Sequence, residues 1–380
     1  MVHNRHMRRA QKDKIIHDIA KKMVFIVGPR QAGKSWLAKD IAKEFKCSVY
    51  LSYDALEDRK IIKAKSWLAS TELLILDELH KMPKWKNFLK GLYDTKSEQL
   101  KIIVTGSARL SAFSKAGDSL AGRYFVHHLF PVSPAELNAL SLPIDINRLI
   151  TRSGFPEPYL MQDDIDALRW RMQYINSLIT VDVLNFDNIS NLKAMQMVFE
   201  LLRYRVGSPL SIKNIAEDVA VSPHTVKKYI NVLEDLYIIF RVSPYSKNIA
   251  RSLLKESKIY FFDTGLVQGD NGAQFENFVA TCLIKHTYMR RDYQAKNCRL
   301  HYLRTKEKQE VDFALICDDQ IEQIIEAKFS DSEVSRALLY FHDKYHLPAK
   351  QVVQELIREY RRGDIEVVKA INYLVALEMF

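Results

Sequence analysis

The feature that most constrains the fold of this chain is a glycine-bounded loop near its N-terminus. Residues 28–35 read Gly-Pro-Arg-Gln-Ala-Gly-Lys-Ser and fit the pattern G-x-x-x-x-G-K-[ST]. The apolar run Met23 to Val27 before the loop predicts a buried parallel strand. Apolar residues at helical spacing after it, from Trp36 to Ala42, predict a helix. Strand, loop and helix in this order predict a phosphate-binding loop, because backbone N–H groups and a helix N-terminus then face the phosphate.

The side chains of this loop suit that role. Gly28 and Gly33 allow a sharp turn and a close approach of the backbone to phosphate oxygens. Lys34 supplies a positive charge for the β- and γ-phosphates, and the hydroxyl of Ser35 can ligate Mg²⁺. The alternative is a chance match in a glycine loop, which the flanking strand and helix make less attractive.

A second apolar strand ends in two carboxylates. Residues 72–78 read Glu-Leu-Leu-Ile-Leu-Asp-Glu. Asp77 is a candidate ligand of Mg²⁺, and Glu78 is a candidate general base for an attacking water. The alternative is an ordinary buried strand with an acidic end, and the phosphate loop upstream argues against it.

A third strand, Leu100 to Thr105, ends in the polar residues Thr105, Gly106 and Ser107. Nucleotides bind at the carboxyl edge of open α/β sheets, so Thr105 or Ser107 could contact the γ-phosphate. Turn formation is an equally good explanation of these residues. Arg109 and Arg123 are candidates for an arginine that stabilises charge during phosphoryl transfer, against the simpler interpretation of surface charge.

These motifs together resemble a widespread prokaryotic family. The matching strings are the loop itself, Leu-Asp-Glu-Leu-His with Trp85 shortly after, Thr-Gly-Ser-Ala-Arg-Leu and Leu-Ala-Gly-Arg-Tyr. Family members join an AAA-type ATP-binding module to a C-terminal domain of unknown function, and the resemblance runs from about residue 20 to the C-terminus. It implies ATP with Mg²⁺ as ligand. The implied ATP-binding residues are Gly28, Pro29, Arg30, Gln31, Ala32, Gly33, Lys34, Ser35, Trp36, Asp77, Thr105 and Ser107.

Length, charge and cysteine content bound the remaining possibilities. A chain of 380 residues predicts two or three domains, and a net charge of +10 favours an acidic partner, with nucleic acid first. Four scattered cysteines without a C-x-x-C pair predict reduced thiols and a cytoplasmic protein. No apolar run approaches the length of a membrane span, and the basic N-terminus lacks the apolar core of a secretion signal.

The middle of the chain predicts a winged helix-turn-helix. Apolar residues of 211–220 share one helix face, a short turn follows, and Pro223 starts a second helix before the strand 238–242. If this segment reads DNA, the exposed N-terminal positions of the second helix are the candidate contacts: His224, Thr225, Lys227 and Lys228. Packing or subunit contact is the alternative, because two lysines make only a modest phosphate-binding face.

The last third of the chain contains a short acidic pattern on predicted strands. Asp312 is followed fourteen residues later by Glu326-x-Lys328, which resembles the core of the PD-(D/E)XK nuclease fold. Glu326 and Lys328 lie two apart on a strand and so share a face. With Glu276 on the preceding helix, Asp312 and Glu326 could hold Mg²⁺, and Lys328 could stabilise charge. A nuclease-like fold with structural or inactive carboxylates is the alternative.

The sequence therefore predicts an α/β protein of several domains. These are an AAA-type P-loop ATPase domain over 1–145, a helical linker and winged helix over 146–250, and a nuclease-like α/β domain over 251–380. The leading hypothesis is an ATPase in which Glu78, Lys34 and Arg123 act in catalysis and which works on or with DNA. The alternatives are an ATP-gated, Mg²⁺-dependent endonuclease and a non-catalytic, nucleotide-switched regulator. Such a module is compatible with a homo-oligomer.

Overall fold

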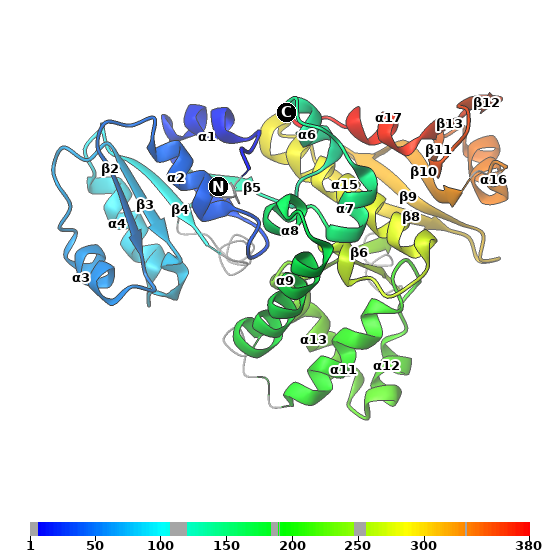
Figure 1. The fold of residues 1–380 in the computed structure, drawn as a ribbon, viewed down its shortest axis with the longest axis horizontal. Helices are drawn as coiled ribbons and strands as arrows, with labels where there is room; N and C mark the ends of the chain where they lie inside the picture. Colours follow the sequence, from blue (N-terminus) through cyan, green and yellow to red (C-terminus); the bar gives the residue numbers. More distant parts are fainter. Residues whose placement is uncertain (1–6, 107–119, 184–188, 190, 247–255, 331–332) are drawn as a thin grey trace. The chain divides into compact units, whose positions relative to one another are not determined.

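The computed structural model describes residues 7–106, 120–183, 189, 191–246, 256–330 and 333–380 (Figure 1). It divides into two compact units. The first comprises Met1–Pro131, Phe155–Leu160 and Asp235–Tyr237, and the second comprises Val132–Gly154, Met161–Glu234 and Ile238–Phe380. The division into three domains at residues 145 and 250 stays a prediction.

The first unit is built on a parallel five-stranded sheet with the order β2-β3-β4-β1-β5. The strands are β1 (Met23–Val27), β2 (Ser48–Ser52), β3 (Leu73–Asp77), β4 (Lys101–Thr105) and β5 (Tyr124–His128). The helices are α1 (Lys12–Ile19), α2 (Lys34–Ala42), α3 (Leu56–Ala64), the short 3₁₀ helix η1 (Leu79–Lys81), α4 (Trp85–Thr95) and α8 (Pro156–Leu160). The α/β class and the parallel sheet with flanking helices are thereby confirmed.

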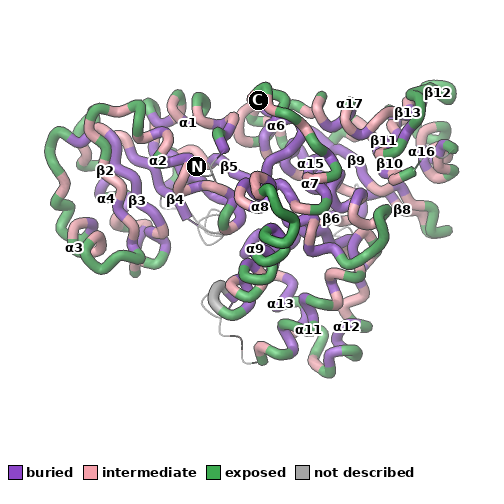
Figure 2. The backbone as a smooth tube through the Cα atoms, viewed as in Figure 1, coloured by how far each residue is buried: buried purple, intermediate pink, exposed green. Residues whose placement is uncertain are grey.

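Helices cover both faces of this sheet because its central strands are apolar on both sides (Figure 2). Val24 and Ile26 of β1 pack with the apolar faces of α1 and α2. Phe25 and Val27, which alternate with them, pack in the cluster that contains apolar residues of α3 and α4. The continuous apolar runs in the sequence thus correspond to strands buried between two helical layers.

The second unit contains most of the remaining helices. They are α6 (Pro134–Ala139), α7 (Ile146–Arg152), α9 (Asp164–Ser177), the π-helical η3 (Leu178–Val183), α11 (Leu192–Arg203), α12 (Ile212–Val219), α13 (Pro223–Asp235), the 3₁₀ helix η4 (Thr264–Leu266), α15 (Asn271–Gln294), α16 (Arg336–Tyr345) and α17 (Ala370–Val375). None of the helices in the described part of the chain combines the length and apolar character needed to cross a membrane.

An eight-stranded mixed sheet organises the second unit, with the order β12-β13-β11-β10-β9-β8-β6-β7. Its strands are β6 (Ile239–Pro244), β7 (Lys258–Phe261), β8 (Cys298–Arg304), β9 (Glu310–Cys317), β10 (Gln320–Ser330), β11 (Ala349–Glu355), β12 (Tyr360–Arg362) and β13 (Ile365–Lys369). Apolar residues of α16 pack in one cluster with residues of β9, β10, β11 and β13. The long helix α15 packs against β7, β8, β9 and β10.

The helix pair α12 and α13 lies at the predicted place, with Pro223 as the first residue of α13. The strands that follow have a wider role than a wing. β6 pairs with β7 in antiparallel fashion and with β8 in parallel, so both strands continue the sheet of the second unit. The winged-helix interpretation stays a prediction.

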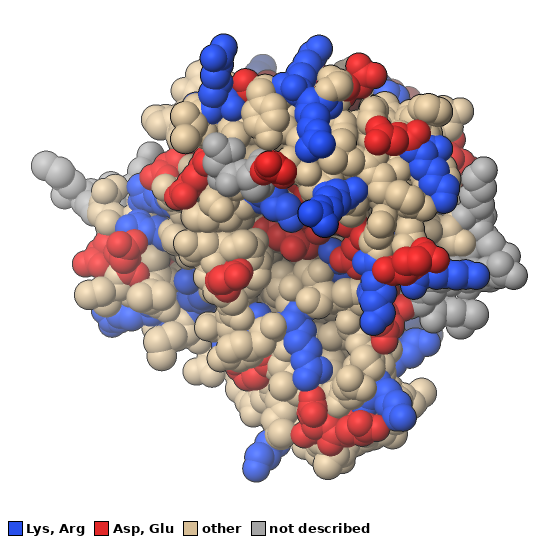
Figure 3. Space-filling view, turned by 90° about the vertical axis from the view of Figure 1, so that its right-hand side faces the viewer, with Lys and Arg blue, Asp and Glu red and all other residues tan. Residues whose placement is uncertain are grey.

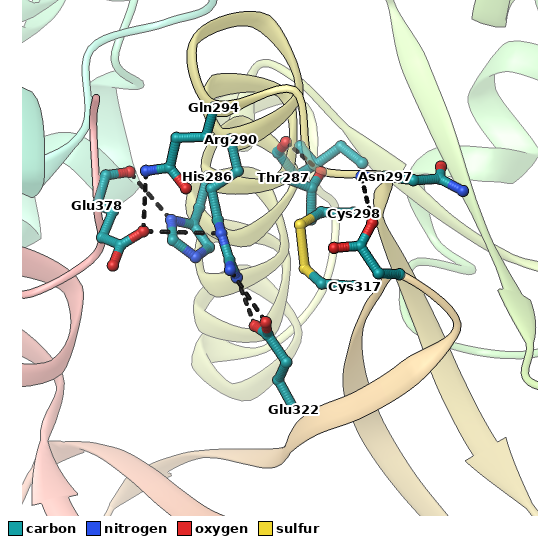
Figure 4. The surroundings of a disulfide bond; sticks show 11 residues. His286, Thr287, Arg290, Gln294, Asn297, Cys298, Cys317, Glu322 and Glu378 are labelled. Atoms are coloured by element: carbon teal, nitrogen blue, oxygen red, sulfur yellow. Dashed lines mark hydrogen bonds and ion pairs between the residues drawn. A yellow bond between two sulfur atoms is a disulfide. The ribbon is translucent and has the colours of Figure 1, made fainter.

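Two of the four cysteines correct the prediction of reduced thiols. Cys298 and Cys317 form a disulfide, whereas Cys47 and Cys282 carry no disulfide (Figure 4). The antiparallel pairing of β8 with β9 places these two cysteines directly opposite each other, with a Cα–Cα distance of 4.0 Å. No sequence spacing indicates this pair, because strand register and not local spacing brings the two residues together.

Candidate nucleotide site and the acidic cluster of the second unit

The phosphate-loop pattern forms the predicted strand–loop–helix turn. β1 ends at Val27, and α2 begins at Lys34 directly after Gly33. Gly33 has a φ of 94°, a conformation that favours glycine. Gly28 has a φ of +143°, and a Cβ there would lie 2.3 Å from the carbonyl oxygen of Leu129. Both glycines of the motif are therefore required by the backbone path that forms the loop.

The Lys34 ammonium is buried inside the curve of the loop. It donates to the carbonyl oxygens of Gly28, at 3.0 Å, and Pro29, at 2.6 Å. The loop is followed directly by the N-terminus of α2. A cation at the centre of such a loop is well placed to bind phosphate oxygens. The other loop residues of the predicted ATP site lie around it: Ala32 is buried, Arg30 and Trp36 are half-buried, and Gln31 is exposed with a φ of 61°.

The carboxylate of Asp77 joins the loop to three strands. The parallel register places Asp77 opposite Ser52 of β2 and Thr105 of β4, at the carboxyl edge of the sheet. Ser35 donates its hydroxyl to Asp77 Oδ2 at 2.8 Å, and Thr105 donates its hydroxyl to Asp77 Oδ1. A serine hydroxyl beside a carboxylate is an oxygen set that Mg²⁺ favours. The residues present therefore fit Mg²⁺ bound together with a nucleotide.

Tyr50, on β2, belongs to this group although the motifs did not indicate it. Its hydroxyl donates to Asp77 Oδ2. Burial and the neighbouring Asp77 raise the pKa of Tyr50, so the phenol stays a neutral donor. Only the pairing of β2 with β3, which sets Tyr50 opposite Ile75, reveals this contact.

Glu78 follows Asp77 in a left-handed conformation with a φ of 54°. Its Oε2 lies 3.3 Å from Lys81 Nζ and 3.6 Å from His80 Nε2. Burial raises the pKa of Glu78, although the charges of Lys81 and Lys34 oppose this shift. Lys81 also donates to both carboxylate oxygens of Asp54, at 2.8 and 2.7 Å. The candidate base thus lies in a defined charge network.

Arg123 lies at the amino edge of the sheet, opposite to the carboxyl edge where the phosphate loop lies. It directly precedes β5, whose first residue pairs with Met23 at the start of β1. Its guanidinium makes two bonds to Asp94, at 2.8 and 3.1 Å. The structure therefore does not bring Arg123 to the phosphate loop of its own chain. Ser107 and Arg109 lie outside the described residues.

Arg9 is a second residue that the sequence motifs missed. Its side chain is 1% exposed and donates to the carbonyl oxygen of Ala32, in the loop, and to that of Phe130, each at 2.6 Å. A buried guanidinium that bonds two separate backbone segments fixes their spacing. The sequence around Arg9 is polar and basic and gave no sign that this arginine is buried.

In the second unit the structure gathers Glu276 of α15, Asp312 of β9, and Glu326 and Lys328 of β10. Asp312 Oδ2 accepts a hydrogen bond from the backbone N–H of Ala327 at 3.1 Å, and Lys328 Nζ lies 2.8 Å from Glu326 Oε1. Burial and the charge of Asp312 raise the pKa of both Glu276 and Glu326. The predicted acidic group is therefore present in space.

A lysine that was not part of the prediction lies within this group. Lys258 Nζ, on β7, is 2.8 Å from Glu310 Oε1 and 3.4 Å from both Glu276 Oε1 and Asp312 Oδ1. Burial lowers the pKa of Lys258, but the three carboxylates outweigh this effect and raise it. Among the described residues, no set of three or more His, Cys, Asp or Glu side chains is arranged to hold a metal ion. The donor set at this place does not fit a divalent cation.

The candidate DNA contacts lie on the first turns of α13. His224 and Lys227 are exposed, whereas Thr225 and Lys228 are half-buried. The hydroxyl of Ser222 accepts a hydrogen bond from the backbone N–H of Thr225 at 3.1 Å, and the two hydroxyl oxygens are 2.8 Å apart. Thr225 is thus engaged in the N-terminal cap of the helix.

Three segments of the chain match known families. Residues 20–138 match an AAA domain, residues 144–272 match a domain of unknown function (DUF8612), and residues 271–374 match another domain of unknown function (DUF4143). Residues 20–138 are therefore similar to an AAA domain, a class of nucleotide-binding domain. The other two matches leave the winged helix and the nuclease-like fold as predictions.

Related proteins are distant in sequence. An uncharacterized protein of Mycobacterium tuberculosis is 24% identical over 246 residues, which are 64% of this chain and 55% of that protein. The chain thus spans about half the length of this curated relative. An uncharacterized protein of Methanocaldococcus jannaschii is 24% identical over 369 residues, with 86% of this chain and 80% of that protein covered.

Two of the solved structures that resemble part of this chain have low TM-scores. The Walker-type ATPase of Pyrococcus abyssi has a TM-score of 0.45 and 14% identity, covering 67% of this chain and 93% of that chain. Thermotoga maritima RuvB has a TM-score of 0.31 and 19% identity, covering 61% of this chain and 88% of that chain.

Proposed function

We propose that this protein is a Mg²⁺-dependent ATPase of the AAA type. The observation that carries the proposal is the contact of Ser35 with Asp77, which sets the two candidate Mg²⁺ ligands 2.8 Å apart beside the buried Lys34 ammonium. Both ligands lie at the carboxyl edge of the parallel sheet, where nucleotides bind in open α/β folds. ATP with Mg²⁺ suits this site because its phosphates need a cradle of N–H groups, a lysine and a hard cation.

Each residue then has a role that follows from its position. Lys34 neutralises phosphate charge, and Ser35 and Asp77 hold Mg²⁺, which would stabilise the charge of the phosphate oxygens. Glu78 takes the proton of the attacking water, because its carboxylate follows Asp77 at the same strand end. Thr105 and Tyr50 orient the Asp77 carboxylate through their hydroxyl groups.

ATP binding and hydrolysis would control the second unit, with DNA as the partner of α13. This part of the proposal depends on the exposed His224 and Lys227 and on the net charge of +10. Arg123 would act in hydrolysis only on the nucleotide of another copy in a homo-oligomer, because it lies at the far edge of its own sheet. Cleavage of DNA by the second unit is not favoured, since Lys258 lies among the carboxylates that a metal ion would need.

The test is ATP hydrolysis by the full chain, measured with no DNA, with single-stranded DNA and with double-stranded DNA. We expect multiple turnovers with wild type, loss of nucleotide binding in Lys34→Ala, and loss of turnover with retained binding in Glu78→Gln. Nicking of the DNA is followed in the same samples.

Lys43→Ala is the matched control, because this exposed lysine lies just after the same helix α2 and pairs with Asp40. It should bind and hydrolyse ATP as wild type does. Binding that survives in Lys34→Ala would contradict the proposed site. Binding without turnover in wild type would favour the nucleotide-switched regulator.

A further inference from the structure

The acidic cluster of the second unit is built around a buried lysine. We infer that Lys258 supplies the cation of this cluster, so that the cluster is a metal-independent, structural ion-pair network and not a site for a divalent ion. The inference concerns Glu276, Glu310 and Asp312 together with Lys258, and it does not depend on the proposed ATPase activity.

The distances show that the ammonium occupies the centre of the group. Its nitrogen lies 2.8 Å from Glu310 and 3.4 Å from both Glu276 and Asp312. Mg²⁺ would need carboxylate oxygens at about 2.0 to 2.1 Å and near-octahedral order. A divalent ion among these oxygens would lie a few ångströms from the buried Lys258 ammonium, and the two positive charges would repel each other.

The surroundings hold Lys258 in this position. Its side chain is 1% exposed, and its nitrogen lies 5.5 Å from the centre of the Tyr302 ring. Its backbone pairs with Val242 of β6 on one side and forms a bridge to Pro209 on the other. The ammonium therefore cannot turn out to solvent without a rearrangement of β7 and its neighbours.

The segment between α11 and α12 closes the cluster from the side of Glu276. Gly207 has a φ of +74°, and a Cβ at this residue would lie 2.7 Å from Glu276 Oε1. The chain here donates hydrogen bonds to β7, from Gly207 N–H to Ile259 O at 3.4 Å, and to the residue before β7, from Leu210 N–H to Ser257 O at 3.0 Å. The backbone thus packs directly on the carboxylate of Glu276.

The remaining carboxylate has a lysine of its own. Glu326 Oε1 pairs with Lys328 at 2.8 Å, and Glu276 accepts a further hydrogen bond from the Tyr260 hydroxyl at 2.6 Å. The chain itself therefore supplies the positive charges and donors that these carboxylates need. The ion pairs of Lys258 link α15, β7 and β9. The acidic residues of the sequence pattern therefore have a structural role in this ion-pair network.

Mn²⁺ binding by the full chain without nucleotide tests the inference. We expect wild type and Asp312→Asn to bind the same number of Mn²⁺ ions by calorimetric titration, because the cluster takes none. Any weak binding at Asp77 is common to both proteins and cancels in the comparison. An additional ion bound by wild type and lost in Asp312→Asn would overturn the inference, as would Mg²⁺-dependent DNA nicking lost in the same variant.

Thermal unfolding of Lys258→Met gives a second measurement, with Lys328→Met as the matched control. We expect the larger fall in the unfolding temperature for Lys258→Met, because three carboxylates then lose their shared cation, whereas the side chain of Lys328 is 40% exposed. A fall no larger than that of Lys328→Met would contradict the inference. If Lys258→Met yields no folded protein, the comparison of wild type with Asp312→Asn decides.

Discussion

At the residue scale, the charge network of Glu78 predicts how hydrolysis depends on pH. A general base acts only when it is ionised, so the rate should rise with pH through the pKa of Glu78. Burial raises this pKa above that of an ordinary glutamate, and Lys81 is the largest influence that lowers it. Removal of the Lys81 charge should therefore raise the pKa further and move the acidic limb of the profile to higher pH.

The measurement is kcat as a function of pH at saturating Mg-ATP for wild type, Lys81→Met and Lys81→Arg. The arginine variant keeps the positive charge and should stay close to wild type. An acidic limb at the same pH in wild type and Lys81→Met would show that Glu78 is not the titrating base.

Residues of the site differ in how far the sequence reveals them. Lys34, Ser35 and Asp77 could be predicted because their chemistry depends on local spacing and on the ends of strands. Tyr50 and Lys258 could not, because their roles come from strand register and from burial among groups distant in sequence. Short sequence motifs identify the residues that would contact a ligand better than they identify the residues that orient or neutralise those contact residues.

At the scale of single elements, α15 stabilises the last strand of the second sheet. Asn277 is buried and accepts a hydrogen bond from Phe261 N–H at 2.7 Å, while its amide donates to Phe261 O at 2.9 Å. β7 ends the strand order, so Asn277 supplies partners that a neighbouring strand would otherwise give. Asn277→Ala should cost about 1 to 3 kcal/mol, because it leaves a buried N–H without this acceptor.

Urea unfolding of wild type, Asn277→Ala and Asn271→Ala measures this cost. Asn271 is exposed on the same helix and serves as the control, with an expected midpoint close to that of wild type. A midpoint for Asn277→Ala equal to that of Asn271→Ala would contradict the assigned role.

The hydrophobic pattern of the sequence predicts individual strands better than it predicts which strands pair with each other. The strands β1, β3 and β4 of the first unit were predicted because parallel strands buried on both faces are continuous apolar runs. No strand was predicted at β5. The pairing of β6 with β8, and of Cys298 with Cys317, depends on which strands become neighbours in the folded sheet. Hydrophobic patterns carry little information on that choice, which is made by packing of the whole unit.

At the scale of the whole molecule, the positive charge is dispersed over the face that Figure 3 shows. Figure 3 shows lysine and arginine side chains interspersed with acidic ones over the described residues of that face, without a single large basic patch. The net charge of +10 therefore predicts DNA binding that depends on a few local contacts. The exposed turn at the start of α13 is the proposed place.

Salt dependence tests this idea. Replacing Lys227 and Lys228 together by alanine should weaken binding to double-stranded DNA and reduce the slope of log K against log salt by roughly 2, because two phosphate contacts are lost. The control replaces Lys306 and Lys308, which are exposed in the turn between β8 and β9. This double replacement lowers the net charge of the protein by the same amount. Equal slopes for both double variants would place the DNA contacts elsewhere.

The hydrogen bonds of Arg9 bear on where the nucleotide-binding domain begins along the chain. The segment that matches the AAA domain starts at residue 20, whereas Arg9 and the apolar face of α1, with Ile15 and Ile19, come before it. A fragment cut at residue 20 would leave β1 without part of its cover and Ala32 without its buried donor. The limits of sequence similarity are therefore narrower than the limits of the folding unit, and recombination that kept this loop intact would have to carry the preceding helix with it.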